Sequence, residues 1–131
     1  MINPPAILKE FLDDQSAITA LTSTRIQGER RWPLPGYKPS DGPLLLFQQQ
    51  PGNLDYSSKH LMVYFRFRCY GANELTANTL YGVLVDTLQD ATSDPMYKAV
   101  LALPGMTQRD PDAPNDWAFV SCVFRCHFRM S

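Results

Sequence analysis

The clearest pattern in this chain is a strict alternation of side chains from residue 59 to residue 71, which read KHLMVYFRFRCYG. Successive side chains of a β-strand point to opposite faces, so the alternation predicts a long strand with two different faces. One face is apolar and consists of Leu61, Val63, Phe65, Phe67 and Cys69. The other face consists of His60, Met62, Tyr64, Arg66, Arg68 and Tyr70. This mixture of aromatic, methionine and arginine side chains is more typical of a protein–protein contact than of a surface left in water.

The last segment of the chain, from Trp117 to Met130, alternates in the same way. Its apolar face consists of Ala118, Val120, Cys122, Phe124, Cys126, Phe128 and Met130. Its other face consists of Trp117, Phe119, Ser121, Val123, Arg125, His127 and Arg129. Antiparallel pairing of the two segments brings both apolar faces to one side, which predicts a sheet with helices on that side only.

Apolar residues at helical spacing predict two main helices. The first begins at Pro4 with Asn3 as its N-cap, and its apolar stripe is Ile7, Leu8, Phe11 and Leu12. The second follows Asn73 as its cap, and its stripe is Ala77, Leu80, Tyr81, Leu84 and Leu88. Between them, we expect Ser16 to cap one further helical turn.

The other segments are short or irregular. Residues 44–50, LLLFQQQ, predict a strand that ends in a turn at 51–53, PGN. Residues 96–106, MYKAVLALPGM, fit a helix or a strand equally well. Four prolines and two glycines at 30–43 exclude a helix and a central strand, so these residues form an arm in the predicted fold. The aromatic groups of that arm, Trp32 and Tyr37, either fold back on the core or dock on a neighbour.

Together these elements predict one α+β domain over residues 1–131, with a mostly antiparallel sheet of about four or five strands and two main helices on one face. A strand of about 13 residues spans roughly 43 Å, whereas a globule of this chain length is roughly 36 Å across. The long strands therefore overhang the body. We expect a neighbouring subunit to cover their apolar outward residues, Met62, Tyr64, Trp117 and Phe119. Trp32 and Tyr37 of the arm belong to the same interface if they dock on a neighbour and do not fold back.

The charges of the chain nearly cancel, since 12 basic and 13 acidic side chains give a net charge of −1. No global field attracts the protein to nucleic acid or to a membrane. Four arginines nevertheless cluster on the predicted outward face: Arg66, Arg68, Arg125 and Arg129. They fit salt bridges between subunits, contacts with DNA phosphates or a solvated face, and the near-neutral charge favours the contact between proteins.

Targeting and membrane-spanning patterns are not found. The N-terminal residues lack the pattern of a secretory signal, and no apolar run reaches the roughly 18 residues of a membrane span. We expect a soluble protein that is made in the cytosol and has no membrane partner.

Catalytic patterns are also absent from the sequence, which contains no glycine-rich phosphate loop, no serine elbow and no zinc-protease helix motif. Cys126 and His127 are consecutive in a strand and point to opposite faces, so together with Cys122 they cannot chelate a metal ion. We expect the cysteines to be reduced core thiols, and the acids at 13–14 and in 110–116 to be solvated. The chain is therefore not expected to be an enzyme or to hold a cofactor or metal.

The order of these features resembles that of the tail terminator and tail-completion proteins of long-tailed bacteriophages. The resemblance rests on ILKEFLDD, SAITALTSTRI, a proline-rich connection, GPLLLFQQQPG, FRFRCYG, ANELTAN and FRCHFRM, in that order. It covers about residues 6–129. The chain departs from the family pattern in the long arm at 30–43 and in the long stretch at 91–116.

The resemblance implies a small α+β virion protein, assembled in the host cytoplasm, that caps the finished tail tube, usually as a hexameric ring. Such a ring ends tube polymerisation and provides the surface to which the head attaches. The implied partners are further copies of the chain, the tail tube protein and the head–tail connector proteins. We add the hypothesis that in such a ring the arginines face the lumen through which DNA passes. The alternatives are a neck or head-closure protein on the head side, and a small enzyme with an unrecognised site.

Overall fold

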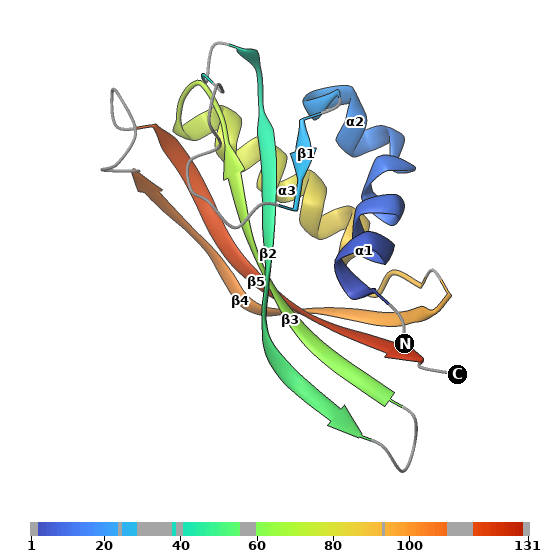
Figure 1. Cartoon of the computed structure of the whole chain (residues 1–131). Coiled ribbons are helices and arrows are strands. Elements are labelled where there is room, and N and C mark those ends of the chain that lie inside the picture. The colour runs from blue at the N-terminus through green and yellow to red at the C-terminus, as the bar shows by residue number, and fades with distance from the viewer. Residues whose placement is uncertain are drawn as a thin grey trace.

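The computed structural model of the chain is a twisted five-stranded sheet with its helices on one face (Figure 1). It describes residues 3–23, 25–28, 38, 41–55, 60–92, 94–109 and 117–129, with the side chains of 51–55 excepted. The elements are α1 (Pro4–Asp13), α2 (Ser16–Thr22), β1 (Ile26–Gln27), β2 (Leu44–Asp55), β3 (His60–Tyr70), α3 (Glu74–Leu88), β4 (Met96–Arg109) and β5 (Ala118–Arg129). This arrangement confirms the predicted α+β class.

The strands lie in the order β1-β2-β3-β5-β4. The β1 strand is parallel to β2, and the other neighbouring strands are antiparallel. The two alternating segments pair without a register shift, from His60 opposite Arg129 to Tyr70 opposite Phe119. Directly opposed residues share a face, so this register places both apolar faces toward the helices, as predicted.

The two main helices begin where the sequence predicts. Asn3 caps α1 and accepts a hydrogen bond from the Ala6 backbone N–H at 3.3 Å, with Pro4 in the first helical position. Asn73 caps α3 and accepts from the Thr76 N–H at 2.9 Å. In both helices the cap oxygen satisfies a backbone donor that has no partner within the helix.

Three local expectations are corrected or resolved by the structure. Ser16 is the first helical residue of α2, and Gln15 occupies the cap position without a side-chain capping bond; its Nε2 donates instead to the Phe11 carbonyl oxygen at 3.3 Å. The PGN segment does not form a turn, because β2 continues to Asp55 and the sheet absorbs one extra residue in a register shift between Gln50 and Asn53. The ambiguous segment at 96–106 belongs to the long strand β4. Proline has no N–H to donate to a ladder, so within a sheet it is found where the ladder is interrupted, as at these register shifts.

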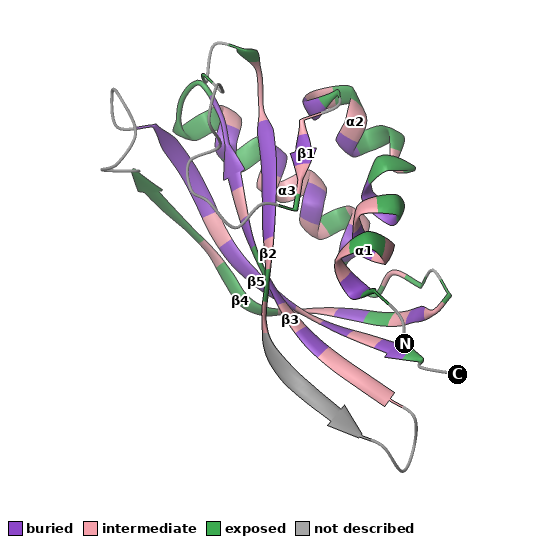
Figure 2. Cartoon of the chain, in the orientation of Figure 1, coloured by how far each residue is buried: buried purple, intermediate pink, exposed green. Residues whose placement is uncertain are grey.

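The core lies between the sheet and the helices. Phe47, Phe65, Phe67, Phe124 and Phe128 fill its sheet side, and all five are nearly or fully buried. On the helix side, the core is covered by the buried residues of α3, which are Ala77, Leu80, Leu84 and Leu88. Burial of each leucine contributes about 1.5–3 kcal/mol, so α3 is a principal source of stability. Figure 2 shows the buried side of each helix turned toward the strands and the exposed side turned away.

Some predicted features lie outside the described residues. These are Trp32 and Tyr37, most of the arm, residues 110–116, and Met130. Among the helices that are described, none is long and apolar enough to cross a membrane.

Candidate assembly interface

The sheet has an outer face, which we define as the face of β2, β3, β5 and β4 that points away from the helices. The β3 residues His60 to Tyr70 at even positions and the β5 residues Phe119 to Arg129 at odd positions lie on it. The β4 residues on this face are Tyr97, Lys98, Val100, Leu103, Met106 and Gln108. All except Tyr97 are register partners of outer-face residues of β5. Tyr97 is assigned to the face because it contacts His60. No described helix packs on this face, so it is the natural place to look for a partner (Figure 1).

One end of the outer face is closed by an aromatic cluster within the same chain. Its members are Leu44, Leu46, Tyr70, Trp117 and Phe119. The Tyr70 ring lies 5.2 Å from the Phe119 ring and 6.2 Å from the Trp117 ring, between centroids. Trp117 and Phe119 consequently have only 9% and 4% of their surface exposed. The structure places them on the predicted face, but in this chain they are buried and do not project as an apolar overhang.

Arg68 extends over this cluster. Its guanidinium carbon lies 4.6 Å from the centroid of the Phe119 ring, and its Nη1 donates a hydrogen bond to the Tyr70 hydroxyl oxygen at 3.2 Å. A cation over an aromatic face is stabilised by the negative charge density of the ring. Arg68 is therefore part of the chain's own packing.

The other three predicted arginines are spread along the outer face. Arg66 is opposite Val123, Arg125 is opposite Tyr64, and Arg129 is opposite His60. The Arg129 guanidinium also lies 5.7 Å from the centroid of the Tyr97 ring. Arg66 and Arg129 are exposed, whereas Arg125 is half-buried. The Nε atom of Arg125 is shielded from solvent and has no hydrogen-bond partner within the described part of the chain.

At the opposite end of the outer face, the two histidines of the chain meet. His127 Nδ1 and His60 Nε2 are 3.0 Å apart, and the Tyr97 hydroxyl is hydrogen-bonded to His60 Nδ1. The pKa of His127 is lowered below its ordinary value, mainly by desolvation and further by the positive charges of His60, Arg125 and Lys98. The contact between the two rings needs one donor and one acceptor nitrogen, so two imidazolium ions do not fit this geometry.

The β4 strand contributes an exposed apolar surface that the sequence pattern did not predict. Leu103 and Met106 have 57% and 62% of their surface exposed. Leu103 is opposite Val123, which in turn is opposite Arg66, so Arg66, Val123 and Leu103 form one row across the sheet. We call Arg66, Val123, Leu103 and Met106 the β4 patch. A proline within an apolar run, here Pro104, is typical of an edge strand and was the one sign of it in the sequence.

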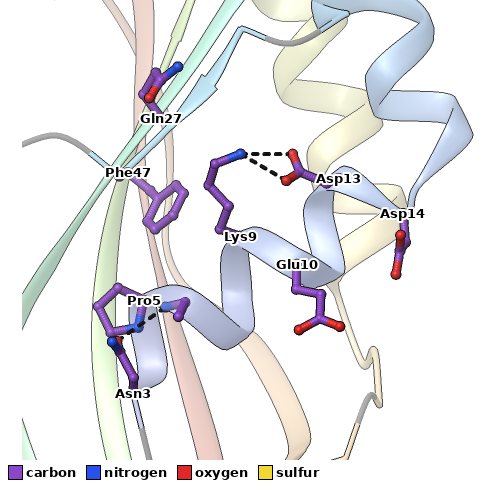
Figure 3. A pocket seen from close by; sticks show the side chains of 10 residues that line it. Asn3, Pro5, Lys9, Glu10, Asp13, Asp14, Gln27 and Phe47 are labelled. Carbon is purple, nitrogen blue, oxygen red and sulfur yellow. Dashed lines mark hydrogen bonds and ion pairs between the residues drawn. The ribbon is translucent and has the colours of Figure 1, made fainter.

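A groove lies at the other edge of the sheet, between α1 and the β1–β2 pair. Its volume is about 690 Å³, and it is lined by Asn3, Pro5, Ala6, Lys9, Glu10, Asp13, Asp14, Gln27, Gly28 and Phe47. Figure 3 shows Phe47 facing α1, the Lys9–Asp13 ion pair beside it, and Glu10 and Asp14 projecting from the helix away from Phe47. We call this the α1 groove. It combines apolar walls with an acidic rim.

Candidates for covalent or metal chemistry are few. Cys69, Cys122 and Cys126 are free and buried, as predicted, and burial raises the pKa of Cys122 and of Cys126 to about 12. Such thiols are almost entirely protonated and poor nucleophiles. Among the described residues, no group of three or more histidine, cysteine or acidic side chains could hold a metal ion.

The chain was compared with known proteins by sequence and by structure. No protein-family model matches the sequence, and no curated protein matches it. Among solved structures, the chain is similar to a chain described as "Virion of native gene transfer agent (GTA) particle". The TM-score is 0.65 at 18% sequence identity, over 95% of this chain and 92% of the other. The likeness shows that the two chains share a fold along nearly their whole lengths.

Proposed function

We propose that this chain is a virion structural protein that caps a finished phage-type tail tube as a ring. The ring ends tube polymerisation and offers the surface to which the head attaches. The observation that carries the proposal is the likeness over nearly the full chain to a component of a virion particle. The order of sequence motifs that resembles tail terminators supports the same assignment independently.

The distribution of surfaces supports an assembly role. A monomeric protein rarely leaves apolar groups grouped on an uncovered face, because such groups favour association. Here the described helices cover one face of the sheet, while Leu103 and Met106 are exposed on the other. The scarcity of reactive groups in the described residues offers no comparable support for an enzyme.

The test is the length of tail tubes. Purified protein is added to polymerising tube protein, and the length distribution is measured by electron microscopy. A terminator shortens the distribution and narrows it as its concentration rises. A neck or head-closure protein acts on the head side, so it leaves tube lengths unchanged and binds the connector ring instead. Unchanged lengths would therefore contradict tail capping.

A further inference from the structure

We propose that copies of this chain join head to tail, with the β4 patch of one copy docked in the α1 groove of the next. The inference rests on the proposed function, which requires the chain to assemble, and adds which two surfaces meet. Both surfaces belong to the described part of the structure, and both present exposed residues: Leu103 and Met106 in the patch, and Ala6, Glu10 and Asp14 at the groove.

The two surfaces lie at opposite edges of the sheet. The β4 strand is one edge, and β1 is the other. The α1 groove includes Gln27 of β1 and Gly28 after it, while Leu103 and Met106 belong to β4. Contact between two different surfaces is heterologous, and each added copy leaves one unused surface at each end. Such contacts produce a closed ring when the rotation between copies closes.

Charge favours this pairing over a pairing of two outer faces. The charged side chains described on the outer face are all cationic: Arg66, Arg68, Lys98, Arg125 and Arg129. The rim of the α1 groove instead presents Glu10 and Asp14, which are both exposed. Two outer faces in contact would bring like charges together. A head-to-tail contact sets arginine against carboxylate, which fixes orientation between partners.

The apolar residues of the two surfaces also favour the head-to-tail contact. Pro5, Ala6 and the nearly buried Phe47 ring line the α1 groove, and its volume of about 690 Å³ lies within the range of cavities that bind small ligands. Leu103 and Met106 project from an edge strand and are small enough to enter such a groove. The methionine side chain is unbranched and adapts to irregular walls, so it suits this contact.

Site-directed crosslinking tests the contact. The variants are Ala6→Cys in the α1 groove, Met106→Cys in the β4 patch, and both together. The native cysteines are buried, so a short bis-maleimide reacts with the introduced thiols only. The double variant is expected to give a ladder of covalent multimers on a denaturing gel, while each single variant stays monomeric. Dimers from Met106→Cys alone would show that outer faces pair with each other and would overturn the proposal.

A mixing experiment gives a second readout. Leu103→Glu with Met106→Glu disables the β4 patch, and Glu10→Arg with Asp14→Arg disables the groove rim; all four positions are exposed, so the fold should persist. Each variant alone is expected to have the scattering mass of a monomer. Their mixture is expected to stop at a heterodimer, because one intact surface remains on each partner. Leu75→Glu, at an exposed leucine of α3 outside both surfaces, is the matched control and should assemble normally.

The outcomes separate the inference from the proposed function. If the unmodified protein forms rings and both surface variants still do, the docking surfaces are wrong while the capping role stands. If the unmodified protein stays monomeric alone and with tubes, both fail. The Arg66→Glu variant gives a third outcome. If it forms rings normally but no longer binds DNA, Arg66 contacts DNA and not the carboxylates of the next copy, which also overturns the docking proposal.

Discussion

The Gly105 backbone N–H donates a hydrogen bond to the Tyr81 hydroxyl oxygen at 2.7 Å, which ties the edge strand β4 to α3. Gly105 lies where the β4–β5 ladder shifts register, between Leu103 and Met106. The N–H would have no ladder partner at this irregularity, so the tyrosine supplies one. The same contact holds the strand segment that presents the two exposed apolar residues of the β4 patch.

We expect Tyr81→Phe to lower the free energy of unfolding by about 0.5–1.5 kcal/mol, because it removes one hydrogen-bond acceptor without removing the ring. Gly105→Ala should lower it by about 1–3 kcal/mol, the usual cost of overpacking. A Cβ atom at Gly105 would lie 2.6 Å from Tyr81 Cζ and 2.7 Å from Val120 Cγ1. Urea denaturation followed by circular dichroism measures both effects.

Gly82→Ala is the control for the glycine substitution. Gly82 lies inside α3, and a Cβ atom there meets nothing within 4 Å. Alanine should stabilise the helix by about 0.5–1 kcal/mol. Equal destabilisation at Gly82 and Gly105 would contradict the assignment of the effect to the Tyr81 contact.

Substitutions at Phe119 and Leu103, which both lie on the outer face, should distinguish residues that stabilise the fold from residues that mediate assembly. Phe119 is buried in the aromatic cluster, so Phe119→Ala should lower the free energy of unfolding by about 3–5 kcal/mol. Leu103 is mostly exposed, and Leu103→Ala should change that free energy by less than about 0.5 kcal/mol. Denaturation midpoints and scattering mass should be measured for both. Normal assembly of Leu103→Ala, combined with a large loss of stability, would mean that Leu103 serves the fold and not the interface.

The histidine pair predicts a loss of stability in mild acid. The pKa of His127 is lowered from its ordinary value of 6.5, mainly by desolvation and also by nearby positive charge. The unfolded chain therefore binds a proton at this position more readily than the folded chain does. Stability from this residue is complete above pH 6.5 and decreases as the pH falls from there through the lowered pKa.

His127→Gln should remove that part of the pH dependence, because glutamine does not titrate. The measurement is the urea midpoint of both proteins at about pH 7.5 and about pH 5.5. The decrease should be smaller in the variant. An equal decrease in the two proteins would show that His127 is not the group responsible.

Thiol labelling tests the burial of the cysteines. A pKa of about 12 for Cys122 and Cys126 leaves very little thiolate near neutral pH. A maleimide should label the native protein slowly and all three thiols rapidly after denaturation, as mass spectrometry would show. Rapid labelling of the native protein would contradict the packing of the core.

The paired strands β3 and β5 were predictable because each has one face that the helices cover. Burial on that face requires an apolar residue at every second position, and the sequence shows this from Leu61 to Cys69 and from Ala118 to Phe128. The helix starts at Asn3 and Asn73 were predictable because capping is a local interaction. The helix starts thus depend on residues close in sequence, and the two strands depend on burial of one face only.

The β4 strand was not predictable in the same way. Its register shifts three times against β5, so residues two apart do not stay on one face. The meeting of Tyr97 with His60 and the exposure of Met106 both depend on which strand lies beside β5. The position of Trp117 on the outer face was predicted, but its burial depends on Leu44 and other residues far away in the sequence. Its role at a subunit interface, like that of Met62 and Tyr64, stays a prediction.

Negative-stain electron microscopy of tail tubes incubated with this protein tests the assembly role most directly. We expect a ring-shaped density closing one end of each tube, and open ends when Leu103→Glu and Met106→Glu are introduced together. Tubes whose ends stay open with the unmodified protein, or that bind it only along their sides, would contradict the capping role.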